Sequence, residues 1–419
     1  MNSHGGPEMT DRDSLTYKKV INAPADLIYR AFTSSSAIRE WLCDIVTINL
    51  DEGGWFFLAW NRGYFASGHY LKLVPNKAVS FSWIGKDEPN WTQVDVSIAP
   101  LEDEAVFLVE LRHTGLGDGV EWEISREEIA KGWALGLENL KNTLEEGRDL
   151  RLVNRPLIGI YPENLNDITK DSRDNLNLPV DYGVLVADVL QGYGAEKAGM
   201  QSNDVIVAIE GKKVERIKSL GLIINAFKPG DQLAVEVFRG PDKKVLSIDT
   251  MVQKIDPIPE LPEELAKELE SRSSKMIESL ENVFKGVTDA EASYSTGPEE
   301  WSAKEVLVHL IHNERDLHSW INDLVADQER FYDQWPGDRL FRIKATLTTY
   351  PGVDDLITEF RRSLKETVAS IAFLKPNFTR RKASYTRLAM ALLDTPKHVD
   401  EHIQQIKDNI KAARTATTN

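Results

Sequence analysis

The C-terminal part of the chain contains the stretch Lys397-His398-Val399-Asp400-Glu401-His402-Ile403-Gln404-Gln405-Ile406, in which two histidines stand four residues apart. On a helix this spacing stacks two side chains on one face, about 6 Å apart along the axis. Val399, Ile403 and Ile406 form an apolar stripe, so the stretch predicts an amphipathic helix whose imidazoles border the core. A third histidine, His309, lies within another apolar stripe at helical spacing.

The histidines His309, His398 and His402 predict a site for a divalent metal. A buried polar ring without a partner costs about 1–3 kcal/mol, so three converging rings need a common ligand. Neutral imidazole is a frequent ligand of transition metals. Nitrogen donors suit zinc, nickel, iron or copper, and the sequence does not choose among them.

Two more histidines nearby are rivals for this role. His312 follows His309 by three residues and could reach the same region, but it lies off the apolar stripe, and His318 faces another way. Three alternatives therefore stay open: the trio, a variant that uses His312, and no metal. Glu314 and Asp316 are candidates for a base, and solvated helix charges are the competing interpretation.

Length and composition indicate a soluble protein with several domains. A chain of 419 residues exceeds what one core organises, and 42% hydrophobic with 28% charged residues is typical of globular proteins. The net charge of −16 argues against binding to nucleic acid or anionic membranes. The N-terminus lacks a secretory signal, no apolar run reaches the ~20 residues of a membrane span, and Cys43 is the only cysteine. We expect a cytoplasmic protein without internal disulfides.

Residues 12–150 combine alternating strand patterns with many tryptophans and close with a helix over 126–146. The pattern predicts one curved antiparallel sheet wrapped on that helix. The segments 20–33 and 132–141 resemble the START-like (SRPBCC) superfamily, in the branch similar to activators of the heat-shock protein 90 ATPase. The resemblance implies an α+β helix-grip fold around a cavity for a small hydrophobic ligand.

The candidates for the lining of that cavity are aromatic side chains, and the competing interpretation is that they simply fill the core. They are Trp41, Trp55, Phe57, Trp60, Phe65, Trp83 and Trp122. His69 and His113 are lone strand histidines, for which we expect structural roles.

Residues 155–255 contain a short helix that ends at glycine, an Asp-Val-Ile strand and a glycine turn before valine, all within 194–214. This detailed pattern resembles the β-rich PDZ domains attached to bacterial trimeric serine proteases. The resemblance implies a carboxylate-binding loop for the C-terminus of a peptide or protein, and a helix that lines the peptide groove. The loop residues are Leu157, Ile158, Gly159 and Ile160, and the helix residues are Leu220, Ile223, Ile224 and Phe227. The competing interpretation is that the domain only packs against its neighbours.

A proline-rich linker over 254–262 precedes residues 262–413, where four amphipathic stripes predict an all-α four-helix bundle. The segments 299–310 and 398–406 resemble the second and last helices of DinB-like bundles. That family binds a divalent metal with one histidine from the former and two from the latter, which implies His309, His398 and His402 as ligands. The open metal position could hold water or a thiolate, and some members of the family are thiol transferases.

Two functional interpretations follow from these three segments. In the first, the protein is a binding or adaptor protein with a hydrophobic cavity, a PDZ domain for peptide C-termini and a zinc, nickel or iron site. In the second, the bundle is a metal-dependent transferase, similar to thiol transferases, or a hydrolase. We favour binding because no nucleophile or base stands out, and enzymatic activity stays open. A role in the stress response through the first domain rests on family analogy alone.

Overall fold

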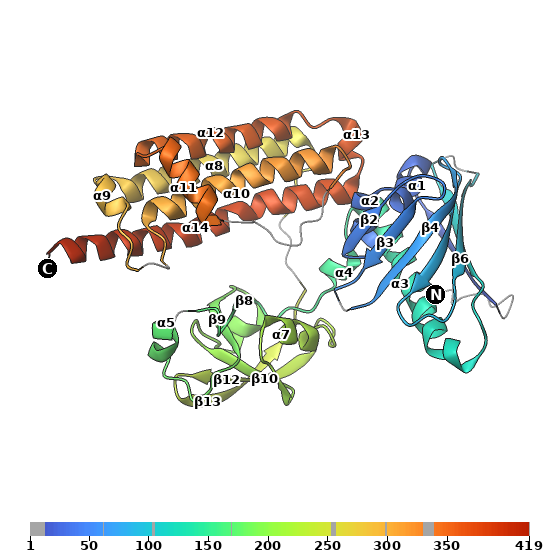
Figure 1. Ribbon diagram of the computed structural model, residues 1–419, viewed down its shortest axis with the longest axis horizontal. Helices are drawn as coiled ribbons and strands as arrows, with labels where there is room; N and C mark the ends of the chain where they lie inside the picture. Colours follow the sequence, from blue (N-terminus) through green and yellow to red (C-terminus); the bar gives the residue numbers. More distant parts are fainter. Residues whose placement is uncertain are drawn as a thin grey trace. The chain divides into compact units, whose positions relative to one another are not determined.

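The computed structural model describes residues 13–61, 63–102, 105–168, 170–252, 257–297, 300–329 and 339–418. The chain divides into two compact units, one made of Met1–Arg148 with Pro257–Asn419 and the other of Asp149–Asp256. The first unit holds a β-rich N-terminal domain and a helical C-terminal region, and the second holds a PDZ-like sheet (Figure 1). Within the described ranges, no helix is long and apolar enough to cross a membrane.

The N-terminal domain is built on a seven-stranded antiparallel sheet in the order β1-β7-β6-β5-β4-β3-β2. Burial alternates along the strands, as in β5, because successive side chains point to opposite faces of a sheet. One face therefore forms a core and the other faces solvent. The strands are β1 (Ser14–Ile21), β2 (Ile45–Ile48), β3 (Trp55–Ala59), β4 (Phe65–Val74), β5 (Ala78–Gly85), β6 (Thr92–Pro100) and β7 (Phe107–Thr114).

Three helices complete this domain: α1 (Ala25–Thr33), α2 (Ser35–Trp41) and the long α3 (Val120–Glu146). The ring of Trp133 on α3 lies 5.5 Å from that of Trp83 on β5, so α3 covers the buried face of the sheet. The helix ends at Gly147, whose φ of 70° suits glycine. The sequence predicted its start near residue 126, and the structure begins it at Val120.

The helical C-terminal region is dominated by α8 (Pro262–Phe284), α10 (Ala303–Val325), α12 (Val353–Ala372) and α14 (Lys382–Thr418). The shorter helices are α9 (Asp289–Ala292), α11 (Arg339–Thr349) and α13 (Pro376–Thr379). The long helices supply residues to two separate apolar clusters, one containing Leu280, Leu310 and Ile403 and the other containing Leu269 and Leu388.

Pro396 lies inside α14, between the residues that belong to these two clusters. Proline has no N–H, so the carbonyl of Leu392 has no helical donor at that position. Arg272 of α8 donates from Nη1 to the next carbonyl, that of Leu393, at 2.7 Å. A side chain from a neighbouring helix thus supports the backbone of α14 where its hydrogen-bond ladder is interrupted.

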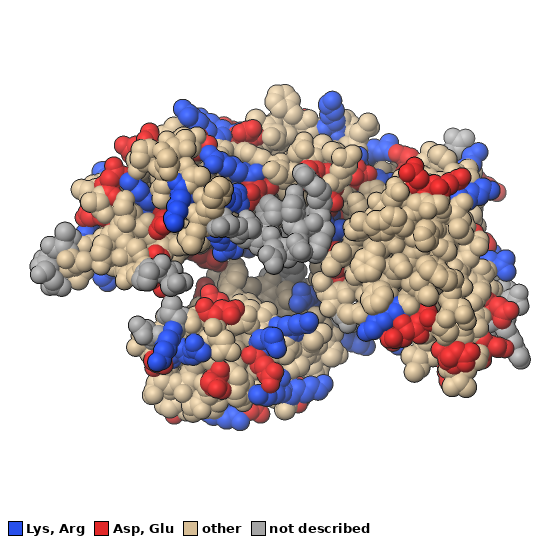
Figure 2. Space-filling model, viewed as in Figure 1, with Lys and Arg blue, Asp and Glu red and all other residues tan. Residues whose placement is uncertain are grey.

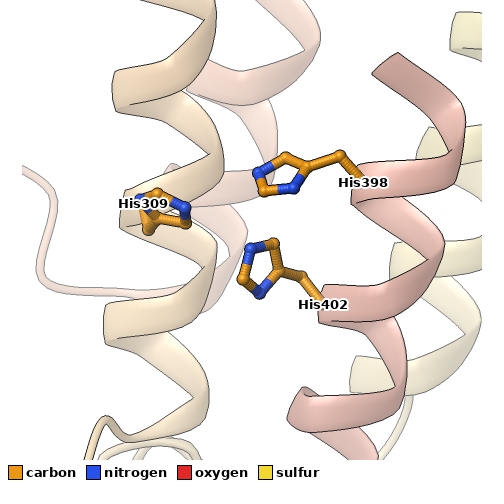
Figure 3. A group of neighbouring side chains, drawn as sticks. All are labelled: His309, His398 and His402. Carbon is orange, nitrogen blue, oxygen red and sulfur yellow. The ribbon is translucent and has the colours of Figure 1, made fainter. Parts of the chain in front are cut away.

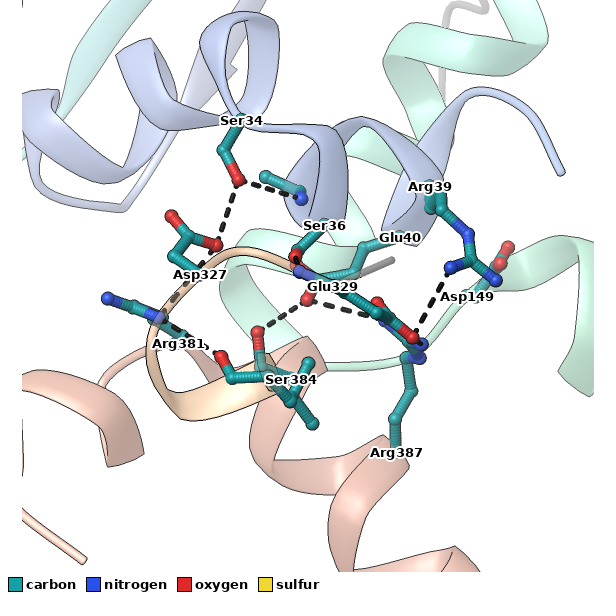
Figure 4. Close-up of polar contacts among 12 residues, drawn as sticks. Ser34, Ser36, Arg39, Glu40, Asp149, Asp327, Glu329, Arg381, Ser384 and Arg387 are labelled. Carbon is teal, nitrogen blue, oxygen red and sulfur yellow. Dashed lines mark hydrogen bonds and ion pairs between the residues drawn. The ribbon is translucent and has the colours of Figure 1, made fainter. Parts of the chain in front are cut away.

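Charged and polar side chains join the N-terminal domain to the helical region (Figure 4). Arg30 of α1 donates from Nε and Nη2 to the two carboxylate oxygens of Asp327, at 2.8 and 2.6 Å. Ser34 donates to the same carboxylate at 2.8 Å, and the buried Glu40 of α2 accepts from Ser384 of α14. Loss of one partner from a buried ion pair costs about 3–5 kcal/mol. These contacts explain why two segments far apart in sequence form one unit.

The PDZ-like unit contains a sheet in the order β13-β12-β10-β9-β8, with β11 paired to β10. Its strands are β8 (Ile160–Asn164), β9 (Val184–Val189), β10 (Val205–Ile209), β11 (Lys212–Lys213), β12 (Gln232–Arg239) and β13 (Asp242–Asp249). Its helices are α4 (Leu150–Val153), α5 (Lys170–Asn175), α6 (Gly194–Lys197) and α7 (Ile217–Ile224). β8 ends this strand order, and among the described strands it pairs only with β9, so its other edge offers a place for an added strand.

Candidate functional site

His309, His398 and His402 come together between two helices of the C-terminal region (Figure 3). His309 projects from α10, and the other two project from successive turns of α14. One nitrogen from each ring lies within 4.8 Å of the other two. The ring centroids are 4.9 Å apart for His309 and His402 and 4.5 Å apart for His398 and His402. Nitrogens that bind one metal at about 2.0–2.1 Å can stand no more than about 4.2 Å apart, so the three rings are close to that arrangement and would draw slightly together around an ion.

A capping box fixes the start of α10 and thereby the position of His309. The backbone N–H of Ser302 donates to the Glu305 carboxylate at 2.7 Å, and the N–H of Glu305 donates to Ser302 Oγ at 3.3 Å. Trp301, just before the helix, places its ring 5.2 Å from that of His309. The indole therefore covers one side of the histidine cluster.

The surroundings of the cluster favour the neutral form of His309 and His398. The pKa of His309 is lowered from 6.5 to about 3, most strongly by burial and less strongly by the neighbouring imidazoles of His402 and His398. Burial, followed by His402, also lowers the pKa of His398. A neutral imidazole keeps a lone pair, which is the form that binds a metal.

Two amide side chains beside the cluster were missed in the sequence analysis. Asn313, one turn after His309, donates from Nδ2 to His398 Nε2 at 2.6 Å. His402 Nδ1 donates to the Gln405 side-chain oxygen at 2.9 Å, which leaves the lone pair on Nε2. The spacings of four from His309 and three from His402 are the signal that could have found them.

The rival histidines and the base candidates lie outside the cluster. His312 is buried and shares a hydrogen bond of 2.8 Å with Thr346, and His318 shares one of 2.8 Å with Thr367. Glu314 accepts from the same Thr367 hydroxyl at 2.8 Å. Asp316 accepts from Arg342 at 2.7 and 2.9 Å. Each of these groups has a protein partner of its own.

The predicted cavity residues of the N-terminal domain divide into three groups. Trp41 and Trp83 line an internal space of only about 20 Å³, which is room for about one water molecule. Trp122 is buried elsewhere in the core, and Trp60 is half-buried with its ring 5.2 Å from that of Tyr64. The described interior is therefore filled by the domain's own side chains.

The third group lies on the opposite face of the sheet. Trp55, Phe57 and Phe65 are 48%, 38% and 44% exposed and do not line the space between sheet and helix. Phe57 and Phe65 stack with ring centroids 6.0 Å apart. The predicted lining is wrong for these three, because Phe56 and Leu58 between them point inward. The face of this domain seen in Figure 2 is largely free of charged side chains.

His113 of the N-terminal domain is a fully buried histidine with a structural environment. Its Nδ1 accepts from the indole N–H of Trp133 at 3.0 Å, so its Nε2 carries the proton and donates to Thr92 Oγ1 at 2.7 Å. Burial lowers the pKa of His113 to about 3. Both ring nitrogens are therefore satisfied within the protein. His69 lies on the exposed face, with its ring 6.1 Å from that of Trp91.

The predicted carboxylate loop of the PDZ-like unit directly precedes and begins β8. Gly159 has φ of 86°, and a side chain there would collide with Tyr193. The carbonyls of Ile158 and Gly159 accept from the amides of Ala195 and Leu190. In the described part of the chain, no backbone acceptor is seen for the amides of Ile158 and Gly159 themselves. Such amides can hold an anionic group such as a carboxylate.

Helix α7 flanks the same edge strand, and the backbone N–H of Ile217 donates to the Asn164 side chain at 2.8 Å. Of the predicted groove residues, Leu220 and Ile224 are buried, and Ile223 and Phe227 are partly buried against the same core. Side chains at the boundary between core and groove offer an apolar wall to a peptide.

Two sequence families match the chain in these regions. The family described as Activator of Hsp90 ATPase homolog 1-like protein matches residues 22–145, and the PDZ domain family matches residues 156–252. The chain thus carries an N-terminal domain of the first kind and a PDZ domain. A PDZ domain supports peptide partners, because it binds extended peptides by strand addition.

Similar proteins cover only parts of the chain. A probable periplasmic serine endoprotease DegP-like from Hahella chejuensis is 25% identical over 39% of this chain and 36% of its own length. The chain therefore spans about a third of that relative. The solution structure of the Aha1 dimer from Colwellia psychrerythraea is 21% identical, covering 32% of this chain and 98% of that one, with a TM-score of 0.29. The HtrA3 PDZ domain with a phage-derived ligand is 26% identical, covering 23% and 86%, with a TM-score of 0.20.

Proposed function

We propose that this protein is an adaptor that captures the C-terminus of a partner protein through its PDZ domain and holds a divalent transition metal at His309, His398 and His402. In this proposal the C-terminal helices form a DinB-like four-helix bundle. The observation that carries the metal site is the approach of three imidazole nitrogens within 4.8 Å of one another. The Asn313 amide nitrogen lies 2.6 Å from His398 Nε2 and 3.4 Å from His309 Nε2, and in this proposal a metal replaces it as their partner.

The donor set fits a transition metal of the zinc, nickel or iron group. The three donors are nitrogens, and the cluster includes no carboxylate among the described residues, so magnesium or calcium is a poor fit. Gln405 holds the His402 ring with its Nε2 lone pair free, as the outer partner of a metal ligand does. Three protein donors also leave a position for an exogenous ligand.

Metal analysis tests this part of the proposal. Protein purified without chelator should contain about one transition metal per chain by inductively coupled plasma mass spectrometry. The His402→Ala variant should contain almost none, and the matched His318→Ala variant should keep the metal because His318 lies outside the cluster. Wild-type protein that neither retains nor takes up zinc, nickel or iron would contradict the metal site.

Peptide capture is tested with peptides that differ only at the terminus. A hexapeptide library with valine, leucine or isoleucine as the last residue suits the apolar wall of the groove. A member with a free carboxylate should bind the full-length protein, and its amidated form should bind at least tenfold more weakly. Equal affinity for both forms would show that the loop at Ile158–Ile160 does not bind the peptide carboxylate.

The alternative of a metal-dependent transferase or hydrolase has less structural support. Glu314 and Asp316 are engaged by Thr367 and Arg342, away from the three histidines. An open groove of about 1070 Å³ lies along α8 and α14, but its lining includes none of the three histidines. Binding is therefore the function that the arrangement of the described residues supports best.

A further inference from the structure

The free edge of β8 carries a proline at a position that decides how a peptide can pair with it. Along an antiparallel edge strand, successive residues direct their N–H and C=O groups alternately to the neighbouring strand and to the open side. The Gly159 carbonyl accepts from Leu190, and the Leu165 amide donates to Gly183, so both face the β9 side. The register shifts by one residue between Tyr161 and Pro162, but the extra residue, Ala187, belongs to β9, so the alternation along β8 continues. Ile160, Pro162 and Asn164 therefore direct their backbone groups to the open side.

The open edge of β8 offers fewer backbone N–H donors than an edge strand without proline. Ile160 has an N–H and a C=O, but Pro162 has only a C=O because its ring nitrogen has no hydrogen. At Asn164 the side-chain oxygen accepts from the first amide of α7, and Nδ2 donates to Asp167 at 2.8 Å. The Asn164 side chain thus links the end of strand β8, just after Pro162, to the start of α7 by a hydrogen bond.

A second side-chain hydrogen bond joins the two walls of the groove at the end near the carboxylate loop. Arg155, just before the loop, donates from Nε to the side-chain oxygen of Asn225, directly after α7, at 3.1 Å. The groove thus runs from Arg155 to Asn164, with α7 antiparallel to β8. A peptide whose carboxylate meets the amides of Ile158 and Gly159 would lie antiparallel to β8 and place its third-last residue opposite Pro162.

We infer that this PDZ domain pairs with only the last three residues of a free C-terminus, because Pro162 lacks an N–H and the next outward carbonyl, that of Asn164, already accepts from the Asp167 amide at 2.9 Å. This inference rests on the proposed capture of C-termini. The carbonyl of Pro162 accepts the N–H of the third-last peptide residue, but the carbonyl of that residue receives no donor from β8. Recognition therefore depends on the carboxylate and the last side chain, and the partner needs little extended chain.

The first experiment compares peptide lengths on the full-length protein by isothermal titration calorimetry. The probe is the tightest member of the hexapeptide library described above, together with the acetylated tripeptide of the same ending. The two should bind within about twofold of each other. A hexapeptide that binds more than tenfold tighter would show that pairing continues past Pro162.

The second experiment is a double-mutant cycle between Pro162 and the peptide. Pro162→Ala restores the missing donor and should tighten binding of the hexapeptide about two- to tenfold, the worth of one net hydrogen bond. Replacement of the amide between the third-last and second-last peptide residues by a trans alkene should abolish that gain. Glu163→Ala is the matched control, because it replaces the neighbouring exposed side chain without adding a backbone donor and should leave the affinity unchanged.

The outcomes separate the inference from the proposal beneath it. Loss of binding on amidation, combined with no gain in Pro162→Ala, would overturn the inference and leave carboxylate capture intact. Absence of binding by every free peptide would overturn the capture itself. If Pro162→Ala does not fold, the alkene peptide still tests the inference on the wild-type protein. There, replacing the amide by the alkene should weaken binding less than twofold. A fivefold or greater loss of affinity would show that the peptide carbonyl does receive a hydrogen bond, contrary to the inference.

Discussion

His113 in the N-terminal domain is fully buried and His309 in the helical region is half-buried, and the pKa of each is lowered to about 3. Their partners differ. His113 contacts an indole N–H and a hydroxyl, so each ring nitrogen has a complementary group. His309 lies against two other imidazoles. The lowered pKa is therefore the same in both regions, and the identity of the neighbours separates a structural histidine from a candidate ligand.

The largest expected effect is the loss of metal from the helical region. His309→Ala should reduce bound metal from about one ion per chain to near zero, because a site with two imidazoles binds far more weakly than a site with three. His113→Leu should leave the metal content unchanged. Metal release by His113→Leu, at a pH where the protein stays folded, would remove the distinction between the two histidines.

The second effect concerns stability and belongs to His113. His113→Leu leaves the buried Trp133 N–H without its acceptor, whereas the Thr92 hydroxyl keeps its hydrogen bond to the Trp83 carbonyl at 3.0 Å. We expect the free energy of unfolding in urea to fall by about 1–3 kcal/mol, the cost of one unsatisfied buried group. The exposed His69 gives the control, since His69→Leu should change it by no more than about 0.5 kcal/mol.

The third effect is a dependence on pH that the same histidine produces. The folded state keeps His113 neutral down to pH 3, whereas the unfolded chain takes up a proton below about 6.5. The contribution of the neutral His113 to the free energy of unfolding is therefore fully present above pH 6.5. It falls on acidification toward pH 3 by about 1.4 kcal/mol per pH unit. Urea unfolding of metal-free protein at pH 7, 6 and 5 should show a shallower fall for His113→Leu. Parallel curves for variant and wild type would contradict the assigned environment.

The smallest effect tests the amide beside the metal ligands. Asn313 donates to His398 Nε2 and so competes for the lone pair that a metal would use. Asn313→Ala should tighten zinc binding about two- to tenfold, measured by competition with a chromophoric chelator. Weaker binding in the variant would instead indicate that the Asn313 oxygen contributes to the site.

Much of this organisation could be predicted from sequence because its signals are local. The spacing of His398 and His402 places both rings on one face of a helix, and the Ser302 capping box marks where α10 begins. The approach of His309 to that pair is a contact between distant helices. The apolar stripe around His309 suggested that approach, and the resemblance to a family sharpened which histidines to name.

The errors and omissions also have physical reasons. Residues 55–58 are apolar on both faces of β3, so alternation could not tell which face is the core. The outward Trp55 and Phe57 were therefore assigned to the interior. Asn313 and Gln405 are polar residues on amphipathic helices, where solvent exposure is the usual expectation.

The proline inside α14 has a mechanical consequence. A helix resists bending through its backbone hydrogen bonds, and α14 lacks one at Pro396. The segment before this point is anchored beside the N-terminal domain through Ser384, and the segment after it carries both histidines of the pair. Bending of α14 will therefore concentrate at Pro396. Each half can tilt with its own apolar cluster, so a displacement at the Ser384 end is absorbed before it reaches the imidazoles.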